Sequence, residues 1–387
     1  MIVNGALFGD SCCGCGVCAE KCVNKAIQMV PNNQGFFYPK IIVEKCINCG
    51  ICVDACAFNH VHLEHVSLQQ SFAVKNRDAN IRAKSRSGGV FTAISDFILA
   101  HNGVVYGCKM IDCRTAVHSR ATSKEERDAF LGSKYIPSIL FSVYPQIRED
   151  LKLGRYVLFS GTACQVNAIK HFCEDLDCSK LILADIVCHG VPSPVVWSDY
   201  LDFLEAKFHD KIVSVNFRDK ARFGWAAHFE TVLFEGGKVY SSHTFRDLFY
   251  NHLALRRSCF HCPFKCLDRV GDFTLADCWG IATNLPDFDD DKGVSLLFVN
   301  SVNGSVIFRA IQDQLDCVPV DPKDFPQPPL RQNWPVPDEY EKFWSSYHHH
   351  SFSWMLHVYV YNIRYYKKKM NQFCRRFIRK IRSFMRR

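Results

Sequence analysis

The distribution of apolar and polar positions along the middle of the chain predicts an α/β body. Val90, Ile94, Phe97 and Ile98 recur at helical spacing, and Gly103 is placed to end that helix. Short uninterrupted apolar runs bounded by turn residues are typical of buried strands. Such runs occur at Val104–Gly107, Tyr156–Phe159, Leu181–Val187 and Val294–Asn300. A body of alternating strands and helices follows from this pattern.

Turn residues organise the remainder of the chain. Gly236 and Gly237 separate two strand-like runs, which predicts a hairpin between Ala227–Phe234 and Lys238–Ser242. A further helix is expected over Ser305–Gln314. Six prolines between Pro322 and Pro337 predict an extended linker that holds the end of the chain apart from the body, and the aromatic and basic segment from Tyr340 is expected to be helical.

Composition excludes several classes of protein. The chain has 387 residues, of which 48% are hydrophobic and 22% charged, so it has enough apolar surface to fold into two or three domains. No apolar run reaches the roughly 20 residues of a membrane-spanning helix. The N-terminal sequence lacks the basic and then apolar segments of a secretory signal, which predicts a cytoplasmic protein.

The net charge of +8 arises at one end of the chain. Eleven Lys or Arg residues and no Asp or Glu lie between Arg364 and Arg387, and the rest of the chain has 36 basic against 39 acidic residues. The excess of positive charge is therefore confined to a tail. This distribution argues against a nucleic-acid-binding groove across the body.

Eight of the 21 cysteines form a duplicated motif. The pattern C-x2-C-x2-C-x3-C occurs twice with an offset of 34 residues, and a fixed offset with the same internal spacing indicates a repeated unit. Short apolar stretches follow the two halves, at Ala26–Val30 and Val61–Leu63. The cysteines are Cys12, Cys15, Cys18, Cys22, Cys46, Cys49, Cys52 and Cys56.

This spacing is typical of two 4Fe-4S clusters. In two-cluster ferredoxins the fourth cysteine of each run binds the other cluster, so Cys56 is expected to complete the first site and Cys22 the second. Structural zinc sites are the alternative, but they use separated C-x2-C pairs. Two departures stand out: Val23 and Ala57 replace the usual proline after the fourth cysteine, and the extra Cys13 is either a substitute ligand or a neighbour.

Several phrases beyond the cysteine repeat carry a family resemblance. In this order, behind a two-cluster ferredoxin segment, they resemble the beta subunit of coenzyme F-420 (deazaflavin) hydrogenase and dehydrogenase over roughly residues 8–310. The phrases are SRSGGVFTAI (Ser85–Ile94), GSKY (Gly132–Tyr135), SGTACQ (Ser160–Gln165), CHGVPSP (Cys188–Pro194), SCFHCPFK (Ser258–Lys265) and DCWGI (Asp277–Ile281). The resemblance implies a reductase subunit that binds FAD or FMN and exchanges electrons with the clusters. Relatives in polysaccharide gene clusters leave the substrate open.

Two short segments and a lysine are candidates for flavin contact. Ser87, Gly88 and Gly89 precede a helix, where free N–H groups favour a phosphate, although the residues alone also fit an ordinary N-cap by Ser87. A second candidate segment follows a buried strand, at the end of the sheet where ligands bind in α/β proteins. Its residues are Ser160, Gly161, Thr162 and Gln165. The alternative is that they form only a tight turn between strand and helix. Lys134 is a candidate partner for a phosphate or for reduced flavin, or is simply solvated.

The resemblance also implies a third cluster. Cys164 and Cys188 follow buried strands, Cys259 and Cys262 form a C-x2-C pair, and all four occupy the family's cysteine positions. Ala163 replaces the usual proline of the family, and Cys266 and Cys278 are extra thiols nearby. Buried small hydrophobic cysteines are the alternative. Asp277, Trp279, Gly280 and His189 are weaker candidates for the flavin neighbourhood or for proton transfer.

The basic tail has the pattern of an amphipathic helix. Phe373, Phe377, Ile381 and Phe384 form one apolar stripe surrounded by Arg and Lys. Such a helix binds an anionic membrane surface. Docking on the chain's own acidic body or on a partner helix remains open. The membrane alternative predicts a peripheral protein at the inner face of the membrane.

Together these patterns predict an α+β protein with four segments: a two-cluster ferredoxin-like domain (1–66), two parts of an α/β flavin-binding-type body (67–150 and 151–321), and a proline-rich linker with a basic C-terminal helix (322–387). The expected function is that of an iron–sulfur flavoprotein oxidoreductase, with a redox partner protein or ferredoxin and a small-molecule substrate. The rival is an electron-relay or scaffold protein without flavin. The direction of electron flow and the oligomeric state stay open.

Overall fold

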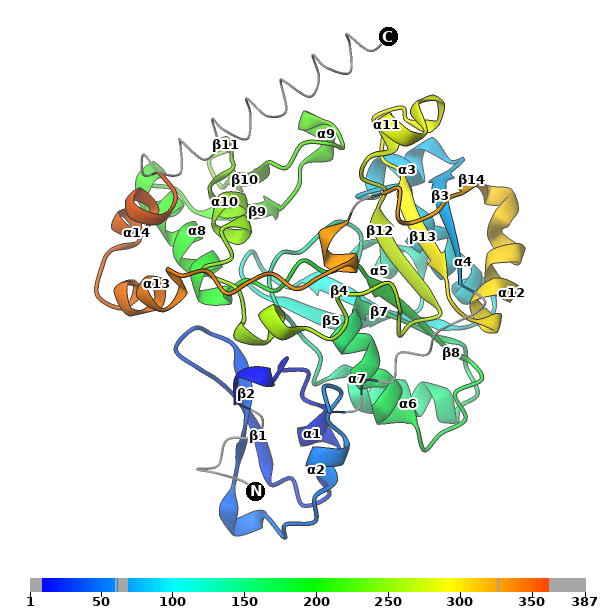
Figure 1. Ribbon diagram of the computed structural model, residues 1–387, viewed down its shortest axis with the longest axis horizontal. Helices are drawn as coiled ribbons and strands as arrows, with labels where there is room; N and C mark the ends of the chain where they lie inside the picture. The colour runs from blue at the N-terminus through cyan, green and yellow to red at the C-terminus, as the bar shows by residue number, and fades with distance from the viewer. Residues whose placement is uncertain (1–8, 60, 62–68, 326, 362–387) are drawn as a thin grey trace.

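The computed structural model describes residues 9–59, 61, 69–325 and 327–361 (Figure 1). Its strands are β1 Ile27–Pro31, β2 Phe37–Ile41, β3 Gln70–Asn76, β4 Val104–Met110, β5 Ala116–Ala121, β6 Ser138–Ile139, β7 Val157–Thr162, β8 Leu181–Ile186, β9 Ile212–Asn216, β10 Glu230–Phe234, β11 Val239–Ser242, β12 Phe273–Asp277, β13 Ser295–Val299 and β14 Leu315–Pro319. Its α-helices are α1 Val17–Glu20, α2 Ile51–Asp54, α3 Ala79–Lys84, α4 Val90–Ala100, α5 Lys124–Asp128, α6 Val143–Lys152, α7 Ala163–Cys173, α8 Pro194–Phe208, α9 Lys220–Phe223, α10 Thr244–Tyr250, α11 Ile281–Asn284, α12 Val302–Ile311, α13 Tyr340–Tyr347 and α14 Phe352–Tyr359.

A nine-stranded mixed sheet forms the centre of the body, in the order β14-β3-β13-β12-β8-β7-β4-β5-β6. Its four middle strands, β12, β8, β7 and β4, run parallel to one another, and β13 pairs antiparallel with β12. The strands that the apolar runs predict, β4, β7, β8 and β13, are confirmed. Because the four middle strands are parallel, their carboxyl ends meet at one edge of the sheet.

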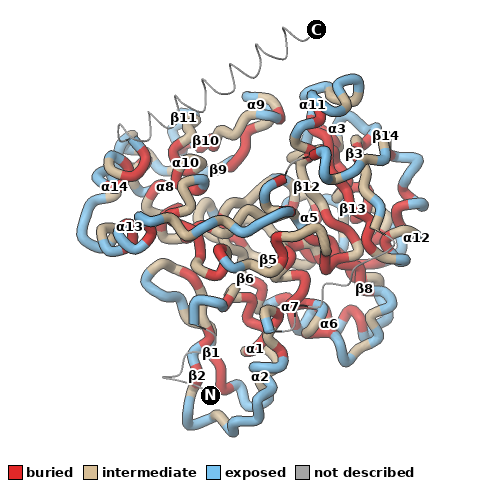
Figure 2. Tube along the Cα trace, viewed as in Figure 1, coloured by how far each residue is buried: buried red, intermediate tan, exposed pale blue. Residues whose placement is uncertain are grey.

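Helices cover both faces of this sheet (Figure 1). Alternate strand residues pack on opposite sides: Leu158 faces the cluster that holds α4 and α12, whereas Phe159 faces the cluster that holds α6 and α7. The buried residues concentrate along these layers (Figure 2). The helix predicted around Val90 is α4, and the helix predicted at Ser305–Gln314 is α12.

A smaller sheet and four helices build a second unit of the body. Strands β9, β10 and β11 form an antiparallel sheet in which the predicted hairpin pairs β10 with β11. Helices α8, α10, α13 and α14 share one apolar core with it, around Trp197 and Phe245. The prediction of helices after Tyr340 is confirmed as far as the structure describes the chain.

The proline-rich segment packs against the body and does not act as a spacer. Phe325 and Leu330 are each only 2% exposed, and the Trp334 indole N–H donates to the His189 carbonyl at 2.9 Å. Among the described residues of this segment, a short 3-10 helix at Pro328–Leu330 is the one regular element, and the prolines do not prevent burial of the apolar side chains between them. The expectation of an extended linker is therefore wrong for these residues.

The N-terminal segment is a small ferredoxin-type domain docked on the body. It contains the β1–β2 hairpin and the short helices α1 and α2 (Figure 1). Two hydrogen bonds tie it to the sheet-covering helices: Tyr144 donates to the Cys15 carbonyl at 3.0 Å, and the Asn167 amide donates to the Ala57 carbonyl at 2.7 Å.

The observed architecture is thus a mixed α+β fold with a large sheet. Within the described residues, no helix is long and apolar enough to cross a membrane. Most of the apolar stretch expected at Val61–Leu63 and the basic tail from residue 362 lie outside the described residues.

Candidate functional site

The two cysteine runs fold into matching local structures. Gly16 and Gly50 precede α1 and α2, and both adopt the left-handed conformation, with φ of 82° and 81°. The helices themselves keep the 34-residue offset of the cysteines. Glycine supplies this conformation without a Cβ penalty. The repeat seen in the sequence is therefore a structural repeat as well.

The thiols of the two runs lie close enough together to influence one another, and Cys52 of the second run also raises the pKa of Cys18 in the first. Burial and then Cys12 and Cys56 raise the pKa of Cys18 to about 12. Burial and then Cys22, Cys46 and Cys49 raise the pKa of Cys52. Cys56 is thus near Cys18 of the first run and Cys22 near Cys52 of the second, and the crossed pairing of ligands stays a prediction. Protonated thiols release protons when they bind iron.

Among the described residues, no three His, Cys, Asp or Glu side chains are placed to hold one metal ion together. A cubane cluster does not need such convergence, because each cysteine binds a different iron atom.

A third group of thiols surrounds a small pocket at the carboxyl edge of the large sheet. We call it the thiol pocket; its lining includes Cys164, Cys188, Cys259 and Cys262. Cys164 lies in the first turn of α7, Cys188 follows β8, and the other two lie in and next to a 3-10 turn at Arg257–His261. The structure therefore brings together four thiols that are up to 98 residues apart in sequence.

The electrostatics of the thiol pocket suit four thiolates around a cluster. Burial and then Cys259 and Cys164 raise the pKa of Cys188, so the four thiols are close enough to influence one another. Three cationic side chains, Arg256, Lys265 and Arg269, also line this pocket. Their positive charges would offset the negative charge of bound thiolates.

Cys13 lies between the N-terminal thiols and the thiol pocket. The pKa of Cys13 is raised well above its usual value, first by its interaction with the Cys15 thiol, and the Cys164 thiol is close enough to affect it too. Cys13 also lines the thiol pocket. The position supports the alternative that Cys13 is a neighbour of the first cluster.

Arg256 connects the same two regions. Its guanidinium donates to the Cys12 and Phe37 carbonyls, both at 2.7 Å, and the residue is 4% exposed. The sequence offers no signal for this role, because Arg256 lies 244 positions from Cys12.

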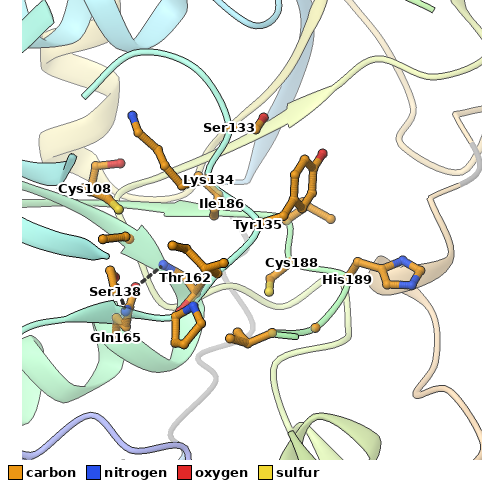
Figure 3. A pocket seen from close by; sticks show the side chains of 18 of the residues that line it. Cys108, Ser133, Lys134, Tyr135, Ser138, Thr162, Gln165, Ile186, Cys188 and His189 are labelled. Carbon is orange, nitrogen blue, oxygen red and sulfur yellow. Dashed lines mark hydrogen bonds between the residues drawn. The ribbon is translucent and has the colours of Figure 1, made fainter. Parts of the chain in front are cut away.

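A large cavity of about 920 Å³ adjoins the thiol pocket. Cys13, Cys164 and Cys188 line both, so the large cavity and the thiol pocket share a wall. Figure 3 shows Cys188, Thr162 and Tyr135 among the side chains that line the cavity. The volume is at the upper end of the range for small-molecule and cofactor sites.

The charged side chains in the lining of the large cavity are mostly basic. Among the described residues that form it, Asp277 is the single carboxylate, against five basic side chains: Arg86, Arg114, Lys134, Arg218 and Arg256. The N-terminal residues of α4 and α7 also face the cavity. Basic side chains and helix N-termini both favour a negatively charged ligand.

Most of the predicted flavin residues lie at this cavity. Ser87, Gly89, Lys134, Ser160, Gly161, Thr162 and Gln165 line it. Gly88 is set back, because a Cβ there would lie 2.1 Å from the Val74 carbonyl oxygen. Its role is close packing. Ser87 is not the N-cap of α4: its hydroxyl donates to the Val294 carbonyl at 2.7 Å, and Gly89 is the N-cap.

Two of these side chains are already engaged within the protein. Burial lowers the pKa of Lys134 to about 8, and its ammonium donates to three carbonyls at the end of α5: Ala129, Phe130 and Leu131. Gln165 caps α7 by accepting from the Thr162 N–H at 3.0 Å, and its amide donates to Ser138 at 2.9 Å (Figure 3). Both line the cavity with their donors largely occupied.

His118 continues this network on the buried side. One ring nitrogen lies 2.9 Å from the Ser138 hydroxyl and the other 3.0 Å from the Ser160 carbonyl. Burial lowers the pKa of His118 to about 4, so the ring is neutral at pH 7. Sequence reasoning misses it, since an isolated histidine in a strand carries no motif.

The weaker candidates are also placed. Asp277 and Trp279 line the cavity, and Trp279 stacks on Trp225 with ring centroids 4.9 Å apart. Gly280 is the N-cap of α11. His189 lines the cavity and contacts His252 at 2.7 Å between ring nitrogens, and burial lowers the pKa of His189 to about 3.

Comparisons with known proteins agree with the motifs. Residues 154–323 match a family described as the C-terminal part of the beta subunit of coenzyme F420 hydrogenase/dehydrogenase. Residues 11–60 match a 4Fe-4S dicluster domain. The resemblance inferred from the sequence is confirmed, and the chain is an iron–sulfur protein of oxidoreductase type related to that beta subunit.

Among solved structures, the chain is similar to a chain of the F420-reducing NiFe hydrogenase complex from Methanosarcina barkeri, studied with xenon. The identity is 17%, the match covers 65% of this chain and 81% of that chain, and the TM-score is 0.44. None of the curated proteins matches this chain.

Proposed function

We propose that this chain is an iron–sulfur flavoprotein reductase, or a reductase subunit, in which electrons pass between 4Fe-4S clusters and a flavin held in the large cavity. The observation that supports this most is the shared wall between the thiol pocket and the large cavity. Cys13, Cys164 and Cys188 belong to both linings. A cluster and a cofactor in these two places would be immediate neighbours.

The thiol pocket is the proposed site of the third cluster. Cys164, Cys188, Cys259 and Cys262 would be its ligands, as the family resemblance also implies. Arg256 and Lys265 would offset part of the charge of the four thiolates, whereas Arg269 is already paired with Asp185. Cys13 would stay outside the ligand set, between the first and third groups of thiols.

FAD or FMN is the proposed occupant of the large cavity. When bound, a flavin exchanges electrons singly with clusters and in pairs with a substrate. The residues of the chain bind and orient it. The N-terminus of α4 favours its phosphate, and the turn Ser160–Thr162 and the amide of Gln165 form part of the wall. The neutral His118 fixes Ser138, which orients that amide.

Release of the cofactor tests this proposal. The protein is purified and reconstituted without oxygen, denatured by heat, and its supernatant chromatographed against FAD, FMN and riboflavin. We expect about one flavin nucleotide per chain. The same preparation should contain about twelve iron atoms, falling to about eight in Cys259→Ser/Cys262→Ser. A chain with full iron and no flavin would contradict the flavin assignment.

The second candidate is a relay or scaffold protein that binds clusters without flavin. One observation favours it: Lys134 and Gln165 use their donors within the protein. A relay protein would return iron and sulfide in the release experiment without any flavin. The cationic cavity favours the flavoprotein, since a relay has no need of it.

A partner chain and a substrate complete the proposal. The matched family is described as a beta subunit, which supports electron exchange with a redox partner protein or ferredoxin. A deazaflavin or an intermediate of polysaccharide synthesis is the proposed class of substrate. Mixing the reduced, flavin-loaded protein with each class anaerobically and following flavin reoxidation separates them.

The basic tail supports a cytoplasmic protein that attaches to an anionic membrane surface. This argument comes from the sequence alone, because the tail lies outside the described residues. Seven of the eleven Lys or Arg residues of the tail surround the Phe373, Phe377, Ile381 and Phe384 stripe, and the other four precede it. Each basic residue near such a surface contributes about 1 kcal/mol.

A further inference from the structure

Two buried arginines stand side by side in the wall of the large cavity. Arg218 donates from Nη1 to Asp277 Oδ2 at 2.9 Å, and Arg86 Nη2 lies 4.0 Å from the same oxygen. Their side chains are 5% and 11% exposed. Neither arginine lines the thiol pocket. We call Arg86 and Arg218 the arginine pair.

The arginine pair has donors that the protein does not use. Arg86 Nε and Nη1 and Arg218 Nε are buried without a hydrogen-bond partner in the part of the chain that the structure describes. Arg86 Nη2 donates to the Trp225 carbonyl at 2.6 Å. A guanidinium carries five N–H donors, and leaving buried charged donors unpaired is costly. These donors therefore lack an acceptor that a ligand can supply.

The charges around the arginine pair do not balance. Two guanidinium groups face one carboxylate, Asp277. The nearby ammonium of Lys220 adds positive charge, and its pKa is lowered to about 8, first by burial and then by Arg86. The ring of His228 is neutral, because burial and then Arg218 lower its pKa to about 2. The phenol of Tyr250, whose pKa burial raises to about 12, adds no negative charge at pH 7.

A helix N-terminus opens into the same cavity beside Arg86. Gly89, the N-cap of α4, has φ of 86°, and no side chain caps the helix. Gly89, Val90 and Phe91 line the cavity together with the arginine pair. The 11-residue helix thus directs free N–H groups and the positive end of its dipole to that wall.

We infer that the arginine pair and the N-terminus of α4 form a binding site for a phosphate group of a ligand in the large cavity. Planar guanidinium groups pair with phosphate oxygens through two parallel hydrogen bonds, and helix N–H groups supply the remaining donors. The proposed function enters only in the choice of this cavity as the ligand site. The phosphate belongs either to the flavin nucleotide or to a second, phosphorylated ligand.

A structural role alone would leave the geometry unexplained. If the arginine pair served only to neutralise Asp277, one guanidinium would suffice, and Arg218 already provides it at 2.9 Å. Arg86 would then be a buried cation with two nitrogens, Nε and Nη1, that have no hydrogen-bond partner among the described residues. Arg86→Gln is therefore the sharpest variant, because it leaves the Asp277–Arg218 pair intact.

The test measures binding of three probes to the cluster-loaded protein freed of flavin: FMN, riboflavin and inorganic phosphate. Fluorescence quenching gives the flavin affinities, and the shift in Tm gives phosphate binding. Arg82→Gln is the matched control, because Arg82 is similarly buried, with a side chain 10% exposed, but pairs with Asp290 and does not line the cavity. Arg218→Lys keeps the charge beside Asp277 and removes the planar fork.

If the phosphate is that of the flavin, Arg86→Gln weakens FMN about tenfold to a hundredfold and leaves riboflavin unchanged. If it belongs to a second ligand, both flavins bind as before and stabilisation by inorganic phosphate disappears. Arg218→Lys should show a smaller loss of the same kind. Equal effects of Arg86→Gln and Arg82→Gln on all three probes would overturn the inference. Failure of any flavin to bind would overturn the proposed function, and inorganic phosphate would still decide this site.

Discussion

Replacing Asp185 by Asn should destabilise the body and prevent the thiol pocket from holding the proposed third cluster. The Asp185 carboxylate is fully buried and accepts from Arg269, from the Gly271 N–H at 3.1 Å and from Thr274 at 3.1 Å. Arg269 also donates to the Phe264 carbonyl at 2.8 Å. This ion pair ties the loop after Cys262 to β8, the strand that leads into Cys188.

The expected loss of stability follows from the burial of both Asp185 and Arg269. The Arg269 side chain is 2% exposed and that of Asp185 0%, so the variant leaves a buried guanidinium without its counter-charge. Breaking such a pair costs about 3–5 kcal/mol. Urea unfolding followed by tryptophan fluorescence measures the loss. Iron analysis should show a fall from about twelve atoms per chain towards about eight.

Asp175→Asn is the matched control. Asp175 accepts two hydrogen bonds from Arg148 at 2.8 Å, but its side chain is 51% exposed. Solvent screens this pair, and its loss should cost at most about 1 kcal/mol and leave the iron content unchanged. A loss of unfolding free energy in Asp185→Asn within about 1 kcal/mol of that in Asp175→Asn would contradict this prediction. An unchanged iron content of Asp185→Asn would contradict it as well.

Three further predictions concern pH, packing and the tail. Because burial holds the pKa of His118 near 4, the unfolded chain takes up a proton at higher pH than the folded chain. The free energy of unfolding should therefore fall by about 3 kcal/mol as the pH drops from 6.5 to 4. His118→Gln should flatten this pH dependence in urea titrations, and an unchanged pH dependence would show that His118 is not its source. Gly14→Ala should lower the free energy of unfolding by about 1–3 kcal/mol. Gly14 has φ of +75°, and a Cβ there would lie 2.7 Å from Arg256 Nη1 and 2.8 Å from the Phe37 carbonyl oxygen. A loss below about 0.5 kcal/mol in thermal melts would contradict this prediction. The full chain should co-sediment with anionic vesicles, less so in high salt, whereas a chain ending at Asn362 should not; equal sedimentation of the two would exclude the tail as the membrane anchor.

The sequence predicts the centre of the sheet well, because burial on both faces leaves a plain signal. β8 reads LILADI and β13 reads SLLFV, and both are almost entirely buried. β3, QSFAVKN, is not predicted, because it mixes polar and apolar residues; its Ser71 hydroxyl is satisfied by the Val320 carbonyl across the fold. A partner so distant in the chain leaves no local pattern.

The proline-rich segment shows a different limit. Its composition excludes regular secondary structure, and a spacer is the natural interpretation of that composition. Burial of Phe325, Leu330 and Trp334 depends on the surface against which they pack, which a single segment does not encode.

Some residues of the candidate site can be recognised in the sequence and others cannot. Eight cysteines are recognisable by their spacing, and four more through the family resemblance. The arginine pair cannot be recognised from the sequence. Arg86 directly precedes the Ser-Gly-Gly phrase, which is a weak signal, whereas Arg218 lies 132 positions further along and meets it only through the fold. His118 and Arg256 escape sequence reasoning for the same reason.

In the proposed function, the thiol pocket joins the dicluster domain to a flavin in the large cavity. The most direct measurement is the rate of flavin reduction after anaerobic mixing with reduced ferredoxin, for the parent chain and for Cys259→Ser/Cys262→Ser. We predict that the variant keeps its flavin and about eight iron atoms but reduces the flavin at least roughly tenfold more slowly. Reduction of the flavin in the variant at the parent rate would contradict the account.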